Sequence, residues 1–389
     1  MKSAVITGLG QVSAQGAGKN ALLPLISAGV LNADFEPSIQ NELLPEASPL
    51  EDFLTLPHHN QDHLDWLNPK IKKRIDRVTE LALLSCYQAI DDAGFPVDKM
   101  IQSKAKQPWG ISYGSALAGF SNAETVHETF LEEGTSTLPP SFAFQLLGAS
   151  VPGQLGIHYN LNGPILANSN SCAAGNTAIG EALKMIQLGE ASVIIAGASE
   201  CPFAPLTLSA LKRLGVVSQS HPMRPYHPER DGFIPAEASA TLIIEEESHA
   251  KARGAHIYAK ILSYSCVTES HDMTTPERSG TPIKESQLRA LKKAGLAPSD
   301  IDLVSHHASA TQINDRNEGK VMQELYPQAA HHALKAYTGH ALGAASALEA
   351  VLCSLALQEE GYQNIISNAF GFGGIDTALI LQRYNSTNQ

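Results

Sequence analysis

Short apolar runs and longer amphipathic stretches alternate along this chain. The short runs have the length of β-strands, whereas the longer stretches carry apolar residues every three or four positions, as the buried face of a helix does. In the first part of the chain we predict strands at Ala4–Thr7, Trp109–Tyr113, Ser192–Ala196 and Ala240–Glu245, and helices at Arg74–Ala93 and Ala174–Leu188. This alternation favours a layered α/β fold.

The second part of the chain repeats the pattern. Strands are predicted at Ile257–Ser263, Leu303–His306 and Thr377–Gln382, and helices at Glu285–Ala294 and Ala344–Gln358. A Gly-Phe pair precedes an apolar strand in each part, at Gly232-Phe233 and at Gly371-Phe372, and this echo suggests a duplication. Residues 31–69 are rich in Pro, Asn, Asp and His and are predicted to form an irregular surface excursion.

Composition narrows the class of protein. With 389 residues, 43% of them hydrophobic and 17% charged, the chain can bury a large core. Its five cysteines are scattered and lack Cys-x-x-Cys spacing, which argues against a disulfide framework and a zinc site and favours a reducing cytoplasm. No secretory leader and no apolar run of membrane-spanning length is expected. The net charge of −12 argues against a nucleic-acid binder, despite one basic run over residues 70–77.

Cys172 stands out as a candidate nucleophile. It lies in Ser169–Gly175, between a predicted short buried strand at Gly163–Ala167 and the helix that begins at Ala174. Free N–H groups and the positive end of the dipole at a helix start favour a thiolate, and the Cys172 amide can point at an oxyanion. An isolated cysteine is nevertheless more often a small buried hydrophobe, as we expect for Cys86, Cys201, Cys266 and Cys353.

Three further stretches are too rich in small and polar residues for plain core: residues 306–315, 335–345 and 367–374. Together with Cys172, they resemble the active-site motifs of the elongating β-ketoacyl-acyl-carrier-protein synthases of the thiolase superfamily. The resemblance covers nearly the whole chain. It implies a five-layered αβαβα thiolase-like fold built from two pseudo-duplicated halves, residues 1–250 and 251–389.

The resemblance also implies a role for each site residue. Cys172 would carry the acyl chain, while His307 and His340, as neutral imidazoles, would stabilise the enolate formed when a malonyl thioester loses carbon dioxide. Lys335 would orient this network, and Glu349 would join it through water. The remaining assignments are the Cys172 and Phe372 amides as oxyanion hole, Phe370 and Phe372 as gate, and Ser309 and Thr311 as pantetheine ligands.

Several motif positions depart from the family pattern. Asn170-Ser171 replaces Thr-Ala before the cysteine, Ala308 replaces the glycine after the histidine, and Ala336 replaces a serine after Lys335. Residues 236–240, Ala-Glu-Ala-Ser-Ala, replace a glycine-rich stretch. These changes leave the chemistry in place and point to a specialised pathway, such as aryl polyene or polyketide-like lipid synthesis, as readily as to ordinary fatty acid synthesis.

The resemblance further implies the partners. No cofactor or metal is expected, because substrates would arrive on the phosphopantetheine of an acyl carrier protein. Lys70, Lys73, Arg74 and Arg213 fall where the family docks this acidic partner. We expect a cytoplasmic homodimer, or a heterodimer with a related ketosynthase-like chain.

Alternative interpretations remain for these residues and for the whole chain. Lys335 could form an ordinary salt bridge, Glu349 could lie on a helix surface, and the basic run could be a solvated face. His59 and His63 have metal-ligand spacing but lack a third ligand, and the other histidines, including His58-His59 and His331-His332, are predicted to lie on the surface. A non-condensing chain-length factor would usually lack the cysteine. A thiolase would favour a second cysteine near residues 371–374, and an initiating synthase would favour a Cys-His-Asn set.

Overall fold

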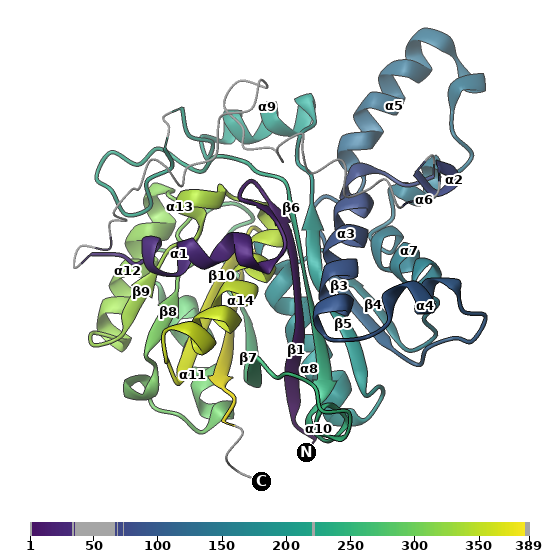
Figure 1. The fold of residues 1–389 in the computed structure, drawn as a ribbon. Coiled ribbons are helices and arrows are strands. Elements are labelled where there is room, and N and C mark those ends of the chain that lie inside the picture. The colour runs from purple at the N-terminus through teal and green to yellow at the C-terminus, as the bar shows by residue number, and fades with distance from the viewer. Residues whose placement is uncertain are drawn as a thin grey trace.

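The protein is described by a computed structural model over residues 2–32, 35, 67, 69–72, 74–219 and 222–385. Its first half contains strands and helices that begin with a long central strand (Figure 1). The strands are β1 (Ala4–Ser13), β2 (Gly16–Ala17), β3 (Gly110–Gly114), β4 (Ile165–Asn168), β5 (Val193–Glu200) and β6 (Ala238–Glu246). The helices are α1 (Leu23–Ala28), α2 (Pro69–Lys72), α3 (Arg77–Asp92), α4 (Val97–Gln102), α5 (Phe120–Glu133), α6 (Phe142–Gln145), α7 (Ser150–His158), α8 (Ala174–Leu188), α9 (Pro205–Leu214) and α10 (Glu247–Ala252).

The second half has fewer helices. Its strands are β7 (Ala259–Thr268), β8 (Leu303–Ser305), β9 (Ala330–His332), β10 (Asn364–Gly371) and β11 (Ile375–Arg383). Its helices are α11 (Thr281–Ala294), α12 (Gln312–Leu325), α13 (Lys335–Thr338) and α14 (Leu342–Glu359).

All strands belong to one continuous sheet, in which the two halves have the same topology. The order is β4-β3-β5-β6-β1-β7-β11-β10-β8-β9, with β2 paired to β1 outside this path. In the first half β3 pairs parallel with β4 and β5, and β6 pairs antiparallel with β5 and β1. In the second half β8 pairs parallel with β9 and β10, and β11 pairs antiparallel with β10 and β7. The strands β6 and β11, which follow the repeated Gly-Phe pairs, occupy equivalent places, so the structure confirms the predicted two-fold repetition.

The helices form layers around the two halves of this sheet. Helix α3 packs against β1 and β6 on one side, and α11 packs against β7 and β11 on the other. Between them α8 and α14 pack against each other, with α8 on β3 and β5 and α14 reaching β6 and β10. The α/β thiolase-like fold predicted from the sequence is therefore the observed one.

Helix α14 is apolar on all sides because it lies in the middle layer. Among the described residues it is the one helix long and apolar enough to cross a membrane by length and composition, yet 89% of that segment is buried inside the protein. The expectation that no apolar run approaches membrane-spanning length is therefore wrong for α14.

Strand β1 is longer than the sequence predicted. It continues past the predicted end at Thr7, through Gly8 and Gly10, to Ser13. These glycines let α3 approach closely, since a Cβ atom would lie 2.1 Å from the Ala89 oxygen at Gly8 and 2.0 Å from the Ser85 oxygen at Gly10. Glycine here serves the contact between helix and strand rather than a turn.

Three other expectations are wrong, and a fourth concerns residues that the structure does not describe. The short strand before Cys172 is not buried: β4 is an edge strand, and Ile165 is 56% exposed. His331 and His332 are buried rather than on the surface, because β9 sits beside β8 under α1 and α12. Most of the predicted excursion over residues 31–69 lies outside the described residues, as do His58, His59 and His63. All five cysteines are free thiols, and Cys266 is exposed, so the expectation of a buried side chain is wrong for this one.

Candidate active site

Cys172 occupies the bend between β4 and α8. It lies in a 3-10 turn, Ser171–Ala173, that leads directly into the helix, and Ser171 before it has a left-handed backbone with φ of 49°. Burial raises the pKa of the Cys172 thiol to about 11, although the Ser171 hydroxyl, 3.8 Å from the sulfur, acts to lower it. Loss of solvation outweighs the hydroxyl, so the thiol holds its proton in the resting protein, where the helix start had been expected to favour a thiolate.

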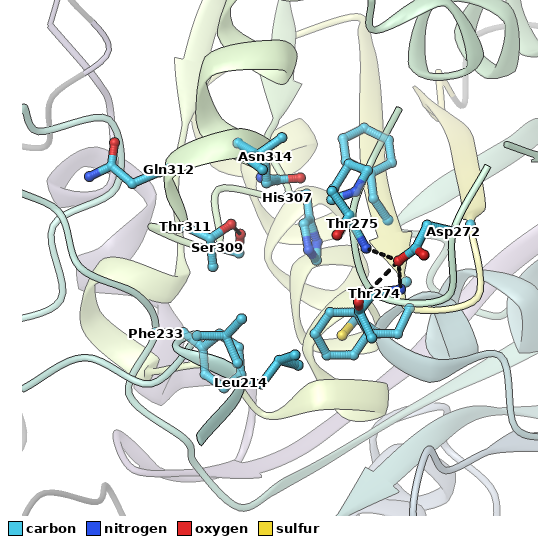
Figure 2. Close-up of a pocket in the computed structure, with 18 of the residues that line it drawn as sticks. Leu214, Phe233, Asp272, Thr274, Thr275, His307, Ser309, Thr311, Gln312 and Asn314 are labelled. Carbon is cyan, nitrogen blue, oxygen red and sulfur yellow. Dashed lines mark hydrogen bonds between the residues drawn. The ribbon is translucent and has the colours of Figure 1, made fainter. Parts of the chain in front are cut away.

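A cavity of about 290 Å³ opens onto Cys172 and draws its walls from both halves. The first half contributes Cys172, Leu214 and Phe233, and the second half contributes His307 and His340 among others. Figure 2 shows His307 pointing into the space between Ser309 and Thr311 on one side and the loop with Asp272 and Thr274 on the other. The structure thus brings the candidate nucleophile and both candidate histidines to one cavity.

The two histidines face each other inside this cavity. Their ring centroids are 5.4 Å apart, with the planes at 81°. The Phe233 ring packs edge-on against His340 at 4.9 Å, and the Phe370 ring lies 5.4 Å from His307. Burial, followed by the nearby Lys335 charge, holds the pKa of both imidazoles well below the usual range. At neutral pH each ring is therefore uncharged and keeps one N–H to donate.

Lys335 connects the His307 backbone to Glu349. Its Nζ donates to the His307 carbonyl oxygen at 2.6 Å and pairs with Glu349 Oε1 at 2.5 Å. Both side chains are 1% exposed, so the alternative of a helix-surface carboxylate for Glu349 is wrong. Lys335 does form a salt bridge, as its alternative supposed, but the pair is buried and Lys335 also binds the His307 carbonyl. Burial raises the pKa of Glu349 to about 7, while Lys335 acts to lower it. The contact between the two side chains is direct, where a water-mediated one had been expected.

His307 belongs to a loop with an unusual backbone. After β8 the chain runs through Ala308 and Ala310, whose φ angles of 44° and 58° lie in the left-handed region. Glu318 on α12 accepts hydrogen bonds from the His307 N–H at 2.6 Å and the Ala308 N–H at 2.8 Å. No role was predicted for Glu318, since sequence spacing alone does not reveal that a carboxylate returns to cap this loop.

Ser309 and Thr311 belong to the same loop and lie on the cavity wall. Their hydroxyl oxygens are 3.0 Å apart, so one donates to the other. Both residues line the cavity, as the sequence predicted for side chains that would meet an entering thioester arm.

The turn over residues 371–374 joins β10 to β11 and touches the Cys172 turn. A Cβ atom on Gly371 would lie 3.0 Å from the Asn170 oxygen and 3.3 Å from the Cys172 nitrogen, so any larger residue would crowd this approach by a few tenths of an ångström. Phe370 is buried and Phe372 is half-buried, and both line the cavity. The predicted oxyanion and gate residues are thus beside Cys172.

A loop that the sequence did not single out closes the other side of the cavity. It spans residues 269–276, after β7, and is joined to the turn by two hydrogen bonds: Gly373 N–H donates to the Met273 oxygen and Glu269 N–H to the Gly374 oxygen, both at 2.8 Å. Asp272 Oδ1 accepts from the Thr274 and Thr275 N–H groups at 2.9 Å, as Figure 2 shows. The Asp-x-Thr-Thr spacing of this local cap was the available signal.

The structure describes the side chains of two of the four candidate docking residues. Arg74 follows α2 and Arg213 lies near the end of α9, and both are exposed. Figure 1 shows α2 and α9 at the same end of the molecule with α5 between them. The Lys70 side chain and Lys73 lie outside the described residues. Across the part of the chain that is described, no three His, Cys, Asp or Glu side chains are grouped to hold a metal ion.

Comparison with known proteins agrees with this architecture. Residues 1–250 match the family described as "Beta-ketoacyl synthase, N-terminal domain" and residues 258–367 match "Beta-ketoacyl synthase, C-terminal domain". A 3-oxoacyl-[acyl-carrier-protein] synthase 2 of Rhizobium meliloti is 29% identical over 99% of both chains. A β-ketoacyl synthase of Burkholderia phymatum is 28% identical, with a TM-score of 0.84 over 99% of this chain and 100% of that one. The ishigamide ketosynthase/chain length factor, at 22% identity, has the same fold with a TM-score of 0.83 over 99% and 100%.

The chain therefore belongs to the β-ketoacyl synthase family of thiolase-like condensing enzymes. Within it, the chain is a homologue of the 3-oxoacyl-[acyl-carrier-protein] synthases, which makes it an acyltransferase.

Proposed function

We propose that this protein catalyses decarboxylative condensation of an acyl chain on Cys172 with malonyl-acyl carrier protein. The observation that carries the proposal is the meeting of Cys172, His307 and His340 on one cavity, with the two neutral imidazoles 5.4 Å apart. A thiol that can hold a thioester and two N–H donors for an enolate are the groups that this reaction needs.

The first step transfers the acyl chain to Cys172. The sulfur attacks the carbonyl carbon of the incoming thioester, the bond from that carbon to the carrier sulfur breaks, and the thiol proton leaves with the carrier thiol. The tetrahedral oxyanion is held by the amides of Cys172 and Phe372. Since burial raises the pKa of the thiol to about 11, we propose that the proton leaves Cys172 only as the carrier arm enters.

The second step uses the second half of the molecule. Malonyl thioester loses carbon dioxide, and the enolate oxygen accepts hydrogen bonds from His307 and His340. The enolate carbon then attacks the carbonyl of acyl-Cys172, and the sulfur leaves with the electron pair and regains a proton. Lys335 holds the His307 carbonyl during this step and so keeps the loop in place, while Ser309 and Thr311 lie where the pantetheine arm would pass.

A condensing subunit is favoured over a non-condensing partner by a specific observation. A chain-length factor would not need a thiol and two uncharged histidines around one cavity, and this chain has all three. We propose that it forms a dimer, either with itself or with a related chain, through the face that bears edge strand β4. Ile165 on β4 is 56% exposed, and Ile157 and Phe144 nearby in sequence are 75% and 68% exposed, as expected of an interface.

The remaining assignments are part of the same proposal. The chain divides near residue 250, residues 70–74 with Arg213 dock the acyl carrier protein, and the enzyme works in the cytoplasm. Asn170 and Ser171 beside the nucleophile support a specialised polyene or polyketide-like product. Mass spectrometry of products formed from carrier proteins with primers of different length and unsaturation tests the last point.

Loss of acyl loading in Cys172→Ala is the direct test of the reaction. Intact-mass spectrometry after incubation with acyl-acyl carrier protein should show one acyl group on wild type and none on the variant, because no other thiol lines the cavity. Cys266→Ala is the matched control, since Cys266 is exposed on β7 and its loss should leave loading intact. Equal loading of Cys172→Ala and wild type would refute the proposal.

A further inference from the structure

A row of buried polar groups lies behind His307, away from the cavity. The Tyr226 hydroxyl lies 2.9 Å from Glu318 Oε2 and 2.5 Å from His306 Nδ1. His306 Nε2 lies 2.7 Å from His331 Nδ1, and His331 Nε2 lies 3.2 Å from the Tyr326 carbonyl oxygen. These contacts link the first half of the chain, through Tyr226, to the loop that carries His307.

The loop needs such support because its backbone is strained. Ala308 and Ala310 both have positive φ, which costs an L-residue roughly 1–2 kcal/mol each. The two N–H groups at the start of the loop are held by Glu318. Whatever fixes the Glu318 carboxylate therefore also fixes the direction in which the His307 ring points.

With Glu318 ionised and both imidazoles neutral, the row has one hydrogen fewer than it has contacts. Each of its four contacts needs a hydrogen, and Tyr226, neutral His306 and neutral His331 supply one each. When Glu318 is ionised, Tyr226 donates to it, and the two imidazole hydrogens can fill only two of the other three contacts. When Glu318 is protonated, it donates to Tyr226, Tyr226 donates to His306, and all four contacts are hydrogen bonds.

The surroundings place the fourth proton on Glu318. Burial holds the pKa of His306 well below and that of His331 below the usual range, so neither readily takes a second proton. Burial raises the pKa of Glu318 to about 7. The charged and titratable groups that face Glu318 are Tyr226, His306, Asp315 on its own helix, with Arg230 on that Asp315, and Asp376 of β11.

We propose that Glu318, Tyr226 and His306 form a buried positioning relay that holds one proton and fixes the backbone of His307 for decarboxylation. Tyr226 touches neither the cavity nor a reacting atom and acts only through Glu318. The inference rests on the proposed function, because it concerns the step assigned to His307.

The test is Tyr226→Phe, which keeps the ring packed on Phe35 and His306 and removes both hydroxyl contacts. With malonyl-acyl carrier protein as substrate, kcat for carbon dioxide release should fall on the order of 10-fold to 100-fold, as expected when a catalytic group is slightly misplaced. KM and the rate of acyl loading on Cys172 should stay unchanged, since the relay reaches neither the carrier surface nor the thiol.

A second readout tests the stored proton. The ratio of wild-type to Tyr226→Phe kcat should decrease as pH rises through about 7, because the row in wild type then loses one of its hydrogen bonds, whereas the variant has no connected row at any pH. His306→Leu keeps the hydrogen bond between Tyr226 and Glu318 and should show the same pH dependence of the kcat ratio. It is the substitute test if Tyr226→Phe does not fold.

Tyr326→Phe is the matched control. Its hydroxyl is buried and has no hydrogen-bond partner among the described residues, so its removal should leave kcat near wild type. A Tyr226→Phe enzyme with wild-type kcat, or a control with the same loss, would overturn the relay. A loss that does not vary with pH would overturn the stored proton. Absence of carbon dioxide release from wild type would instead refute the proposed function.

Discussion

The two halves of the molecule have one topology and different chemistry. In each half the edge strand, β4 or β9, comes before a helix of the middle layer, α8 or α14, with the short helix α13 between β9 and α14. At the start of α8 the first half places Cys172, and just before α14 the second half places His340. Equivalent positions of a repeated fold thus carry the thiol and a histidine, and because α8 and α14 pack together, both reach the same cavity.

The loops after β3 and β8, the first parallel strand of each half, are built alike but hold different side chains. After β3, Glu200 accepts hydrogen bonds from the Ala116 and Leu117 N–H groups at 2.7 and 3.1 Å. After β8, Glu318 does the same for His307 and Ala308. Each loop has an alanine with positive φ, Ala118 at 48° and Ala308 at 44°, and burial raises the pKa of each carboxyl to about 7. One structural device recurs, and only the second half uses it to hold a candidate catalytic side chain.

The largest expected effect separates the two halves by reaction step. His340→Ala should lower malonyl decarboxylation roughly 100-fold to 1,000-fold, as loss of one oxyanion donor does, while Cys172 still accepts an acyl group. Carbon dioxide release and acyl loading are measured on the same preparation. Unchanged carbon dioxide release would mean that the division of labour between the halves is wrong.

A smaller effect is expected where the second half touches the first. Gly371→Ala places a methyl group 3.3 Å from the Cys172 nitrogen and 3.0 Å from the Asn170 oxygen, so the two turns must separate by a few tenths of an ångström. Acyl loading should slow on the order of 10-fold, since the shift removes part of an oxyanion donor. Gly153→Ala is the control: it lies in α7 with no atom within 4 Å of the new methyl group. Equal loading rates for both variants would show that this contact between the halves does not matter.

Ser171→Ala should alter the first half alone. The hydroxyl lies 3.8 Å from the Cys172 sulfur and lowers the pKa of the thiol, so its removal raises that pKa. The thiolate fraction below pH 11 then falls, and alkylation of Cys172 by iodoacetamide should slow a few-fold at pH 8 and shift to higher pH. Decarboxylation at His307 and His340 should not change. If the pH profile of Cys172 alkylation is the same in the variant and in wild type, Ser171 has no influence on the thiol.

The smallest expected effect concerns binding of the carrier protein, and it should be the same for the reaction steps of both halves. Reversing the charge of Lys73 and Arg74 should raise the apparent KM for carrier protein a few-fold at low salt in both steps, because both substrates arrive on the same partner. Lys292→Glu on α11 is the control, an exposed charge on a helix of the opposite outer layer. An unaltered KM in the double variant would favour the solvated-face interpretation of the basic run.

Most of the strands, and the helices α3, α8, α11 and α14, could be predicted from sequence because their hydrophobic period is local. The helices α5, α7, α9 and α12 were not predicted. Helix α8 begins and ends at the residues expected, α11 differs from expectation at its start, and α3 is shorter than expected at both ends. Strand β10 was missed because Ser367, Asn368 and Gly371 do not look like a buried strand, although Ser367 and Asn368 are fully buried. Their polar atoms lie inside because β10 pairs with strands on both sides.

The amino-acid sequence by itself determined the kind of chemistry that this protein can carry. Cys172, His307, His340 and Lys335 are identifiable by residue type and by the motifs around them, because side-chain chemistry is a property of the residue. It also determined the layered fold, through periods of two and of three to four residues.

Tertiary structure decided the protonation states of the site residues and the contacts that support them. The thiol is protonated and the imidazoles are neutral because burial removes solvent, and burial depends on the whole packed chain. Tyr226 and Glu318 lie 92 positions apart, and only the fold brings such distant groups within hydrogen-bond distance.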